Sequence, residues 1–333
     1  MTALVESGSR RSLVALAGLC LTLALGGLPA SAAAAFPDKP LRLVVPYPPG
    51  GAADVMARGL AQQLADALGQ KVIVDNRGGA GGAVAAKTAA SSAADGYTLF
   101  FGTLATQVIN PALNSKLGYD PVKDFVGVSL THLNPRVLIA GPSVEARSVA
   151  ELIAAAKAAP GKLTYGSAGS GSSSHLSGAL FEMLADVQLL HVPYRGSAPL
   201  LTDLLAGRVD LTFDSFAVYE EFIKEGRARP LAVTSLKRMT VLPSLPTLDE
   251  SGLQGYDVSN WLGIFVPAGT PADIVATLNA GVRKAMAEPA LRQQLVALGI
   301  EPATSAPQEL DALVREDTPK WADIVKRSGA KAD

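Results

Sequence analysis

Short apolar runs alternate along this chain with longer segments in which apolar residues recur every three or four positions. The run at 41–45 predicts a buried strand, and the spacing of Met56, Leu60 and Leu64 predicts the buried face of a helix. Further strands are expected at 72–74, 98–101, 163–165, 209–213, 232–234 and within 257–267. This alternation is typical of α/β proteins with largely parallel sheets, which is the fold class that we predict.

Capping sequences and prolines locate the helices. The segment Ser148–Glu151 has the spacing of a capping box. The segment Thr270–Asp273 offers a threonine cap, a proline at the first helical position and an acid at the third. Pro319 is expected to interrupt the last helix. One helical face is expected to hold Leu176, Leu180, Met183 and Leu184.

Two glycine-rich loops, 46–54 and 165–175, each lead from a predicted strand into a predicted helix. Such loops expose backbone N–H groups, and a helix N-terminus carries partial positive charge. Because the two loops are far apart in the sequence, they suggest two halves of one binding site that close around a single anion.

The N-terminus has the pattern of a secretory signal. Arg10 and Arg11 precede an uncharged run from Leu13 to Leu28, and small residues follow at 30–35. The run has 16 residues, whereas a transmembrane anchor needs about 20. We therefore expect residues 1–35 to be a cleaved signal peptide and the protein to be periplasmic. The paired arginines leave open whether export is general or by the twin-arginine route.

Composition excludes several classes of function. Cys20, the one cysteine among 333 residues, lies in the expected signal, so no disulfide, thiolate metal site or cysteine nucleophile is expected in the mature chain. Removing residues 1–35 leaves a net charge of about −2. Nucleic acid and anionic membrane surfaces are therefore not favoured partners.

The glycine loops also fail the patterns of nucleotide sites. Val84 occupies the place of the last glycine of a dinucleotide fingerprint, and Lys87 lacks the spacing of a P-loop. His132, His175 and His191 do not have the spacing of metal ligands on a helix. We expect no cofactor and no metal ion, and a small anion such as a carboxylate fits the loops better.

Candidate ligand contacts come from both loops and from strand ends. At least one serine of the second loop is expected to contact the ligand, and Thr103 follows a predicted strand. Asp54 either caps its helix, holds the loop from behind or accepts a bond from the ligand. Asp214 follows a strand at the edge where α/β sheets present ligand groups. Arg195 is the cationic candidate, although an exposed or structural role is favoured for it.

A serine hydrolase is an alternative, because Ser172 and His175 are close in sequence. The chain has no Gly-x-Ser-x-Gly elbow, and proximity in sequence does not show that the imidazole reaches the hydroxyl. Trp261 and Trp321 are expected to be packing residues.

Several segments together resemble the Bug family of extracytoplasmic solute receptors, the substrate-binding components of tripartite tricarboxylate transporters. They are 44–51, 74–82, 95–99, 161–172, 191–196 and 267–271, in the family's order. The resemblance implies a two-lobed type II periplasmic-binding-protein fold with a ligand cleft between the lobes. The ligand contacts expected from the loops and the resemblance are Tyr47, Gly51, Ala52, Asp54, Thr103, Ser167, Ser172, His175 and Asp214. The acid at Asp214 departs from the small or amide residues frequent there.

These inferences predict a non-enzymatic, monomeric periplasmic receptor. Residues 36–136 and 260–333 are expected to form lobe 1, and residues 137–259 to form lobe 2. The ligand is expected to be a dicarboxylate, tricarboxylate, aromatic acid or acidic amino acid, delivered to membrane subunits of a tripartite tricarboxylate transporter. A ligand presenter for a two-component sensor would have the same binding chemistry and stays an alternative.

Overall fold

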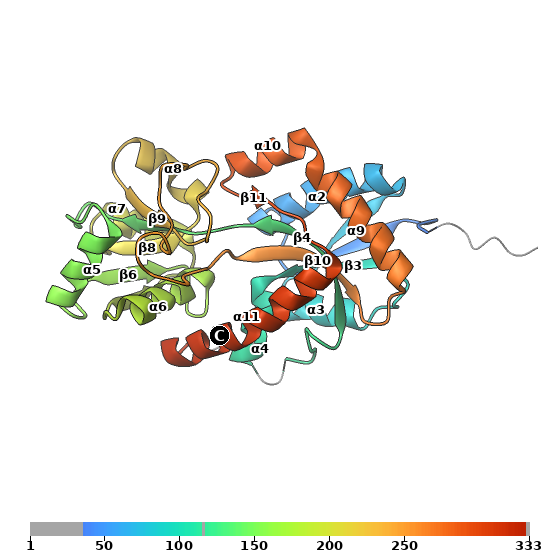
Figure 1. Ribbon diagram of the computed structural model, residues 1–333, viewed down its shortest axis with the longest axis horizontal. Coiled ribbons are helices and arrows are strands. Elements are labelled where there is room, and N and C mark those ends of the chain that lie inside the picture. The colour runs from blue at the N-terminus through green and yellow to red at the C-terminus, as the bar shows by residue number, and fades with distance from the viewer. Residues whose placement is uncertain (1–35, 115–116, 331–333) are drawn as a thin grey trace, which may run out of the picture. The chain divides into compact units, whose positions relative to one another are not determined.

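The computed structural model describes residues 36–114 and 117–330 (Figure 1). The expected signal peptide, residues 1–35, lies outside this range. The chain divides into a short unit, Met1–Asp38, and a large one, Lys39–Asp333, which holds both of the sheets. Among its described residues, no helix has both the length and the apolar character needed to cross a membrane.

The large unit contains a six-stranded sheet. Its strand order is β11-β4-β10-β3-β1-β2. The strands are β1 (Leu41–Val45), β2 (Val72–Asn76), β3 (Thr98–Thr103), β4 (Phe125–Leu133), β10 (Trp261–Pro267) and β11 (Glu301–Pro302).

A second sheet is built from the middle of the chain. Its strand order is β7-β6-β8-β5-β9. The strands are β5 (Val137–Ala140), β6 (Thr164–Ser167), β7 (Leu190–Pro193), β8 (Leu211–Asp214) and β9 (Arg229–Val233). The chain therefore leaves the first sheet after β4, builds the whole second sheet and returns as β10.

Helices cover both faces of each sheet (Figure 1). Beside the first sheet lie α2 (Ala52–Leu68), η1 (Ala80–Gly82), α3 (Ala83–Ala90), η2 (Ala105–Ile109), α4 (Asn110–Leu113), α9 (Ala272–Ala287), α10 (Pro289–Ala297) and α11 (Pro307–Ser328). The second sheet has α5 (Val149–Ala158), α6 (Ser173–Ala185), α7 (Ser197–Leu205) and α8 (Phe216–Lys224).

The alternation of residues along β5 shows how the second sheet is buried on both faces. Leu138 belongs to the core cluster that contains Leu152 of α5 and Leu176 of α6. Its neighbour Ile139 belongs to the cluster that contains Leu200 of α7 and Tyr219 of α8. Successive side chains of a strand point to opposite faces, so a wholly apolar strand needs helices on both sides.

The expectation of largely parallel sheets was wrong. Strands β1, β2 and β3 pair in parallel, as do β6, β7 and β8. However, β10 is antiparallel to both β3 and β4, and β5 is antiparallel to both β8 and β9. The reversal occurs because β5 and β10 are the strands that receive the chain after each passage between the sheets.

Two predicted helix boundaries were also wrong. α11 continues through Pro319, and its buried side chains on both sides of the proline include Val314 and Trp321. The Thr318 hydroxyl donates to the Val314 carbonyl at 2.7 Å, one turn before the proline. The Thr270 hydroxyl donates to the Pro267 carbonyl instead of capping α9, whose N-cap is Pro271.

Local predictions about α5 and α6 met different outcomes. The Ser148 hydroxyl accepts from the Glu151 N–H, as a capping box requires, although the Glu151 carboxylate accepts from Arg147 N–H instead of the cap residue. In α6, Leu176 and Leu180 are buried, whereas Leu184 is 40% exposed. The predicted face was therefore wrong at its C-terminal end.

Candidate functional site

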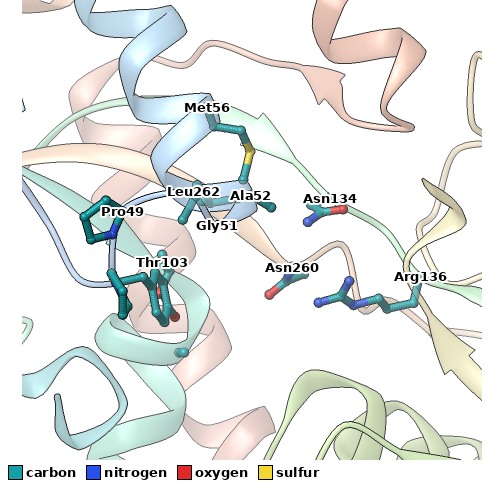
Figure 2. A pocket seen from close by; sticks show the side chains of 13 residues that line it. Pro49, Gly51, Ala52, Met56, Thr103, Asn134, Arg136, Asn260 and Leu262 are labelled. Carbon is teal, nitrogen blue, oxygen red and sulfur yellow. The ribbon is translucent and has the colours of Figure 1, made fainter. Parts of the chain in front are cut away.

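A cavity of about 520 Å³ lies where the chain passes between the two sheets. Figure 2 shows Gly51, Ala52 and Thr103 on one side of it and Arg136 and Asn260 on the other. The described lining residues are Tyr47, Pro48, Pro49, Gly51, Ala52, Ala53, Met56, Thr103, Ala105, Asn134, Arg136, Asn260 and Leu262. The volume is in the range typical of small-molecule sites.

The N-terminus of α2 forms one wall of this cavity. Gly51 is the N-cap and offers no side chain, so the first N–H groups of the helix, including those of Ala52 and Ala53, have no intrahelical acceptor. Both alanines line the cavity. A 17-residue helix that starts here adds the partial positive charge of its dipole. This wall can bind a carboxylate through backbone donors.

Asp54 holds the first glycine loop from behind. Its Oδ2 accepts from Gly50 N–H at 2.9 Å and from Arg58 Nε at 3.0 Å, while its Oδ1 accepts from the Asn76 amide at 2.9 Å. The bond from Arg58 and the bond from Gly50 lower the pKa of Asp54 to about 2. Asp54 is only 4% exposed and is not among the described lining residues, so the carboxylate shapes the loop from outside the cavity.

Hydroxyl groups stand beside this wall. The Tyr47 hydroxyl lies 3.5 Å from Thr103 Oγ1, and both residues line the cavity. Thr103 is held by Thr106, since each backbone N–H donates to the other's hydroxyl, at 3.0 and 3.2 Å. Burial raises the pKa of Tyr47, so its hydroxyl stays a donor at neutral pH.

A neighbouring cavity of about 550 Å³ brings in the second glycine loop. Tyr47 and Ala105 line both cavities, so they adjoin. The loop contributes Ala168, Gly169, Ser170, Gly171 and Ser172. The two glycine-rich loops, more than a hundred residues apart in sequence, therefore face one continuous region.

The second loop is fixed by its own hydroxyls. Ser172 caps α6: its Oγ accepts from His175 N–H at 3.3 Å and donates to the Gly169 carbonyl at 2.6 Å. Ser174 Oγ accepts from Ala168 N–H at 2.8 Å. Ser167 Oγ lies 2.7 Å from His191 Nε2 and is fully buried. Of the predicted contacts on this loop, Ser172 lines a cavity, whereas Ser167 is a buried support.

His175 is also a support for the loop. Its Nδ1 accepts from Gly171 N–H at 3.0 Å, which requires a neutral ring at this nitrogen. Burial lowers the pKa of His175. The bond that links it to Ser172 runs from the His175 backbone N–H, not from the imidazole. Ser172 and His175 thus lack the arrangement of a nucleophile and its base.

Arg136 is the residue that the sequence analysis missed. It lies between β4 and β5, in the passage from the first sheet to the second, and its guanidinium donates to Ser173 Oγ at 2.8 and 3.2 Å. The passage is fixed by the return segment, residues 234–260 between β9 and β10: Asn134 N–H donates to Ser259 O, and Arg136 N–H donates to Thr234 Oγ1. Burial lowers the pKa of Arg136. The signal that could have found it is a lone arginine between two strand-like runs.

Asp214 and Arg195 lie away from both cavities. Asp214 is 3% exposed, and its Oδ1 accepts from Ser215 N–H at 2.8 Å. It pairs across the sheet with Val137, the residue that follows Arg136. Its negative charge favours the charged form of the Arg136 guanidinium. Arg195 is exposed, as the favoured interpretation had it.

The structure thus divides the nine expected ligand contacts into two groups. Those that line a cavity are Tyr47, Gly51, Ala52, Thr103 and Ser172. Those that do not are Asp54, Ser167, His175 and Asp214. In the described parts of the chain, no three His, Cys, Asp or Glu side chains are grouped to hold a metal ion.

Comparisons with known proteins point to one family. The family model described as "Tripartite tricarboxylate transporter family receptor" matches residues 56–330. A structure of the periplasmic binding protein BugD is 35% identical, covers 89% of this chain and 99% of its own, and superposes with a TM-score of 0.70.

Two further solved structures contain a dicarboxylate. Rpa4515 of R. palustris, solved with adipate, is 38% identical, with a TM-score of 0.74 over 89% of this chain and 99% of that one. MatC from Rhodopseudomonas palustris, solved with malate, is 36% identical, with a TM-score of 0.69 over 87% and 100%.

Proposed function

Since the chain belongs to the tripartite tricarboxylate transporter receptor family, we propose that it captures a small carboxylate in the cavity at the start of α2. The observation that carries this proposal is the wall formed by the α2 N-terminus, with Ala52 and Ala53, beside the hydroxyls of Tyr47 and Thr103. Backbone N–H groups and hydroxyls are donors that match carboxylate oxygens.

Capture proceeds by closure of the second glycine loop toward the first. The two loops come from different sheets, and the chain passes between the sheets through short segments that include Asn134 and Asn260. A hinge needs only a few such residues to absorb the change in backbone angles. Asn260 already has a positive φ of 45°.

The protein acts in the periplasm and delivers its ligand to membrane subunits of a transporter. The family description and the periplasmic BugD neighbour support this location and role. The adipate-bound and malate-bound neighbours support a carboxylic acid as ligand. We propose that no catalytic step is involved, because Ser172 is occupied as a helix cap.

The test is thermal unfolding of the chain purified from the periplasm, with a panel of mono-, di- and tricarboxylates and amino acids. A ligand at a hundred times its dissociation constant is expected to stabilise the protein by about 2.7 kcal/mol. Mass spectrometry of small molecules carried through purification identifies the natural ligand. If no acid raises the melting temperature and none copurifies, the proposal is wrong.

Replacing Ala52, the first residue of α2, by proline provides a variant aimed at the backbone donors. It removes one N–H from the first turn of α2, where proline is tolerated by the helix. Carboxylate affinity is expected to fall while unfolding without ligand changes little. Pro289 and Pro307, the first residues of α10 and α11, are precedents in this chain for proline at a helix start.

A further inference from the structure

The charges around the two cavities are one-sided. Among the described lining residues of both cavities, Arg136 is the only one that is charged at neutral pH. No Asp or Glu lines either cavity in the described chain. A bound group near Arg136 therefore meets a cation, and neither lining offers a carboxylate that could bind an ammonium.

Arg136 is held in place without being neutralised by an ion pair. Its Nε and Nη2 both donate to Ser173 Oγ, and no ion pair within 4.0 Å is formed by Arg136 among the described residues. Ser173 is neutral, so it orients the guanidinium and leaves its charge. The remaining N–H donors can bind an oxyanion in the two-pronged geometry that arginine favours.

The two anion-binding features stand at opposite sides of one cavity. Figure 2 shows the Arg136 side chain extending toward Asn260, across from Gly51, Ala52 and Thr103. Asn134 and Asn260 line the Arg136 side and can donate or accept through their amides. A ligand that meets both sides carries one anionic group for the α2 N-terminus and another for the guanidinium.

Asp214 does not reverse this pattern. Its position at the end of a strand made it an expected ligand contact, but the side chain is buried and outside both cavities. Its negative charge acts on Arg136 from behind and favours the charged form of the guanidinium. Asp214 thus supports the cation and does not present an acid to the ligand.

We propose that Arg136 determines specificity by binding a second carboxylate, so that the ligand is a dicarboxylate without an ammonium group. This rests on the proposed function, because it assumes that the first carboxylate occupies the α2 N-terminus. Dicarboxylates are thereby distinguished from monocarboxylates, which leave the guanidinium without a partner. They are also distinguished from acidic amino acids, whose ammonium finds no acid in the cavity.

The experiment measures binding of matched acids by calorimetry. Succinate, glutarate and adipate are each compared with the monocarboxylate of equal chain length, and glutarate is compared with glutamate. The wild-type chain is expected to bind its best dicarboxylate at least 10-fold more tightly than the matched monocarboxylate, since one charge-assisted contact contributes roughly that factor. It is expected to bind glutarate more tightly than glutamate.

Variants then assign the preference to one side chain. Arg136→Gln is expected to weaken the dicarboxylate roughly 10- to 100-fold and to leave the monocarboxylate within about 2-fold. Arg136→Lys keeps the positive charge but loses the two-pronged donor geometry of the guanidinium, so its loss of dicarboxylate affinity is expected to be smaller than that of Arg136→Gln. Ser173→Ala removes the acceptor that orients the guanidinium, and its dicarboxylate loss is also smaller. Arg195→Gln, which removes an exposed arginine, is the matched control and is expected to change neither affinity.

The outcomes separate the two proposals. If the wild-type chain binds no carboxylate, the proposed function itself is wrong. If it binds monocarboxylates and dicarboxylates equally, or prefers glutamate, the inference about Arg136 is wrong while the receptor function stands. The inference is also wrong if Arg136→Gln weakens the binding of the dicarboxylate and of the monocarboxylate by the same factor. It is wrong, too, if this variant binds the dicarboxylate as tightly as the wild-type chain does. Should Arg136→Gln fail to fold, Arg136→Lys and Ser173→Ala decide by the same comparison.

Discussion

The imidazole rings of His175 and His191 stack almost in parallel, with centroids 3.9 Å apart and an interplanar angle of 6°. Both side chains lie beneath the second glycine loop, where His175 accepts from Gly171 N–H and His191 contacts Ser167. Two protonated rings at this distance would repel, so the pair is stable only when it is not doubly charged. The stack therefore links the shape of the loop to pH.

Stability is expected to fall as the pH decreases from about 6.5 toward 4. Burial lowers the pKa of His175, burial and His175 together lower that of His191 to about 4, and burial lowers that of His132 to about 3. Each ring takes up its proton in the unfolded chain first. The stabilisation is complete above the unfolded pKa of about 6.5 and is lost as the pH falls through the folded values.

Urea unfolding at several pH values between 7 and 4 measures this effect. His191→Phe keeps an aromatic ring in the stack but cannot titrate, so its unfolding free energy is expected to fall less steeply over this range. Equal slopes for the variant and the wild-type chain would show that His191 does not carry the pH dependence.

Replacing Asp54 by alanine is expected to destabilise the protein by about 2 kcal/mol and to weaken ligand binding. The substitution leaves Gly50 N–H and the Asn76 amide without their acceptor, and bonds to a charged group are the stronger ones. Asp66→Ala, at an exposed position of the same helix, is the control and should stay within about 0.5 kcal/mol. Chemical unfolding and ligand titration of both variants give the comparison.

Protonation of Asp54 is expected to lower the stability of the fold in a second step, at a more acidic pH than the histidines. Its folded pKa of about 2 lies below the unfolded value of about 3.9, so the stabilisation is present above pH 3.9 and is lost as the pH falls through 2. In Asp54→Asn this part of the acid profile should be missing. A wild-type profile that the variant reproduces between pH 4 and 2 contradicts this role.

Ser172→Ala is expected to cost about 1 kcal/mol of stability, because the hydroxyl caps α6. Ser170→Ala, an exposed position on the same loop, is expected to be neutral. The wild-type chain should neither hydrolyse p-nitrophenyl acetate nor be labelled by a serine-directed fluorophosphonate. Labelling that Ser172→Ala abolishes would instead support the hydrolase alternative.

Gly178→Ala is expected to destabilise the protein by about 1 to 3 kcal/mol through overpacking. An added Cβ would lie 2.2 Å from Cε2 of Tyr165, a ring that itself stacks on His191 with centroids 4.9 Å apart. Gly59→Ala in α2 is the contrast, since its Cβ would meet the ends of two flexible side chains, Leu291 at 3.0 Å and Gln294 at 4.0 Å. A melting temperature for Gly178→Ala that equals the wild-type value would contradict this packing.

The sequence by itself determined the local elements and much of the first wall of the site. Periodicity located β1 and α2, and the glycine-rich loop between them placed Gly51 and Ala52 at a helix N-terminus. These features depend on neighbouring residues, which a single sequence displays directly. The family resemblance followed from the same short segments, and the comparisons confirmed it.

Only the tertiary structure decided which polar groups face the cavity. Thr103 and Asp214 each end a strand, and Asp54 ends the loop after another, yet Thr103 lines the cavity while both acids turn toward other parts of the chain. Arg136 reaches the cavity because the passage from β4 to β5 is bonded to the return segment at Thr234, about a hundred residues later. Such long-range pairings fix both the antiparallel entry of β5 and β10 and the charge of the site, and no local pattern records them.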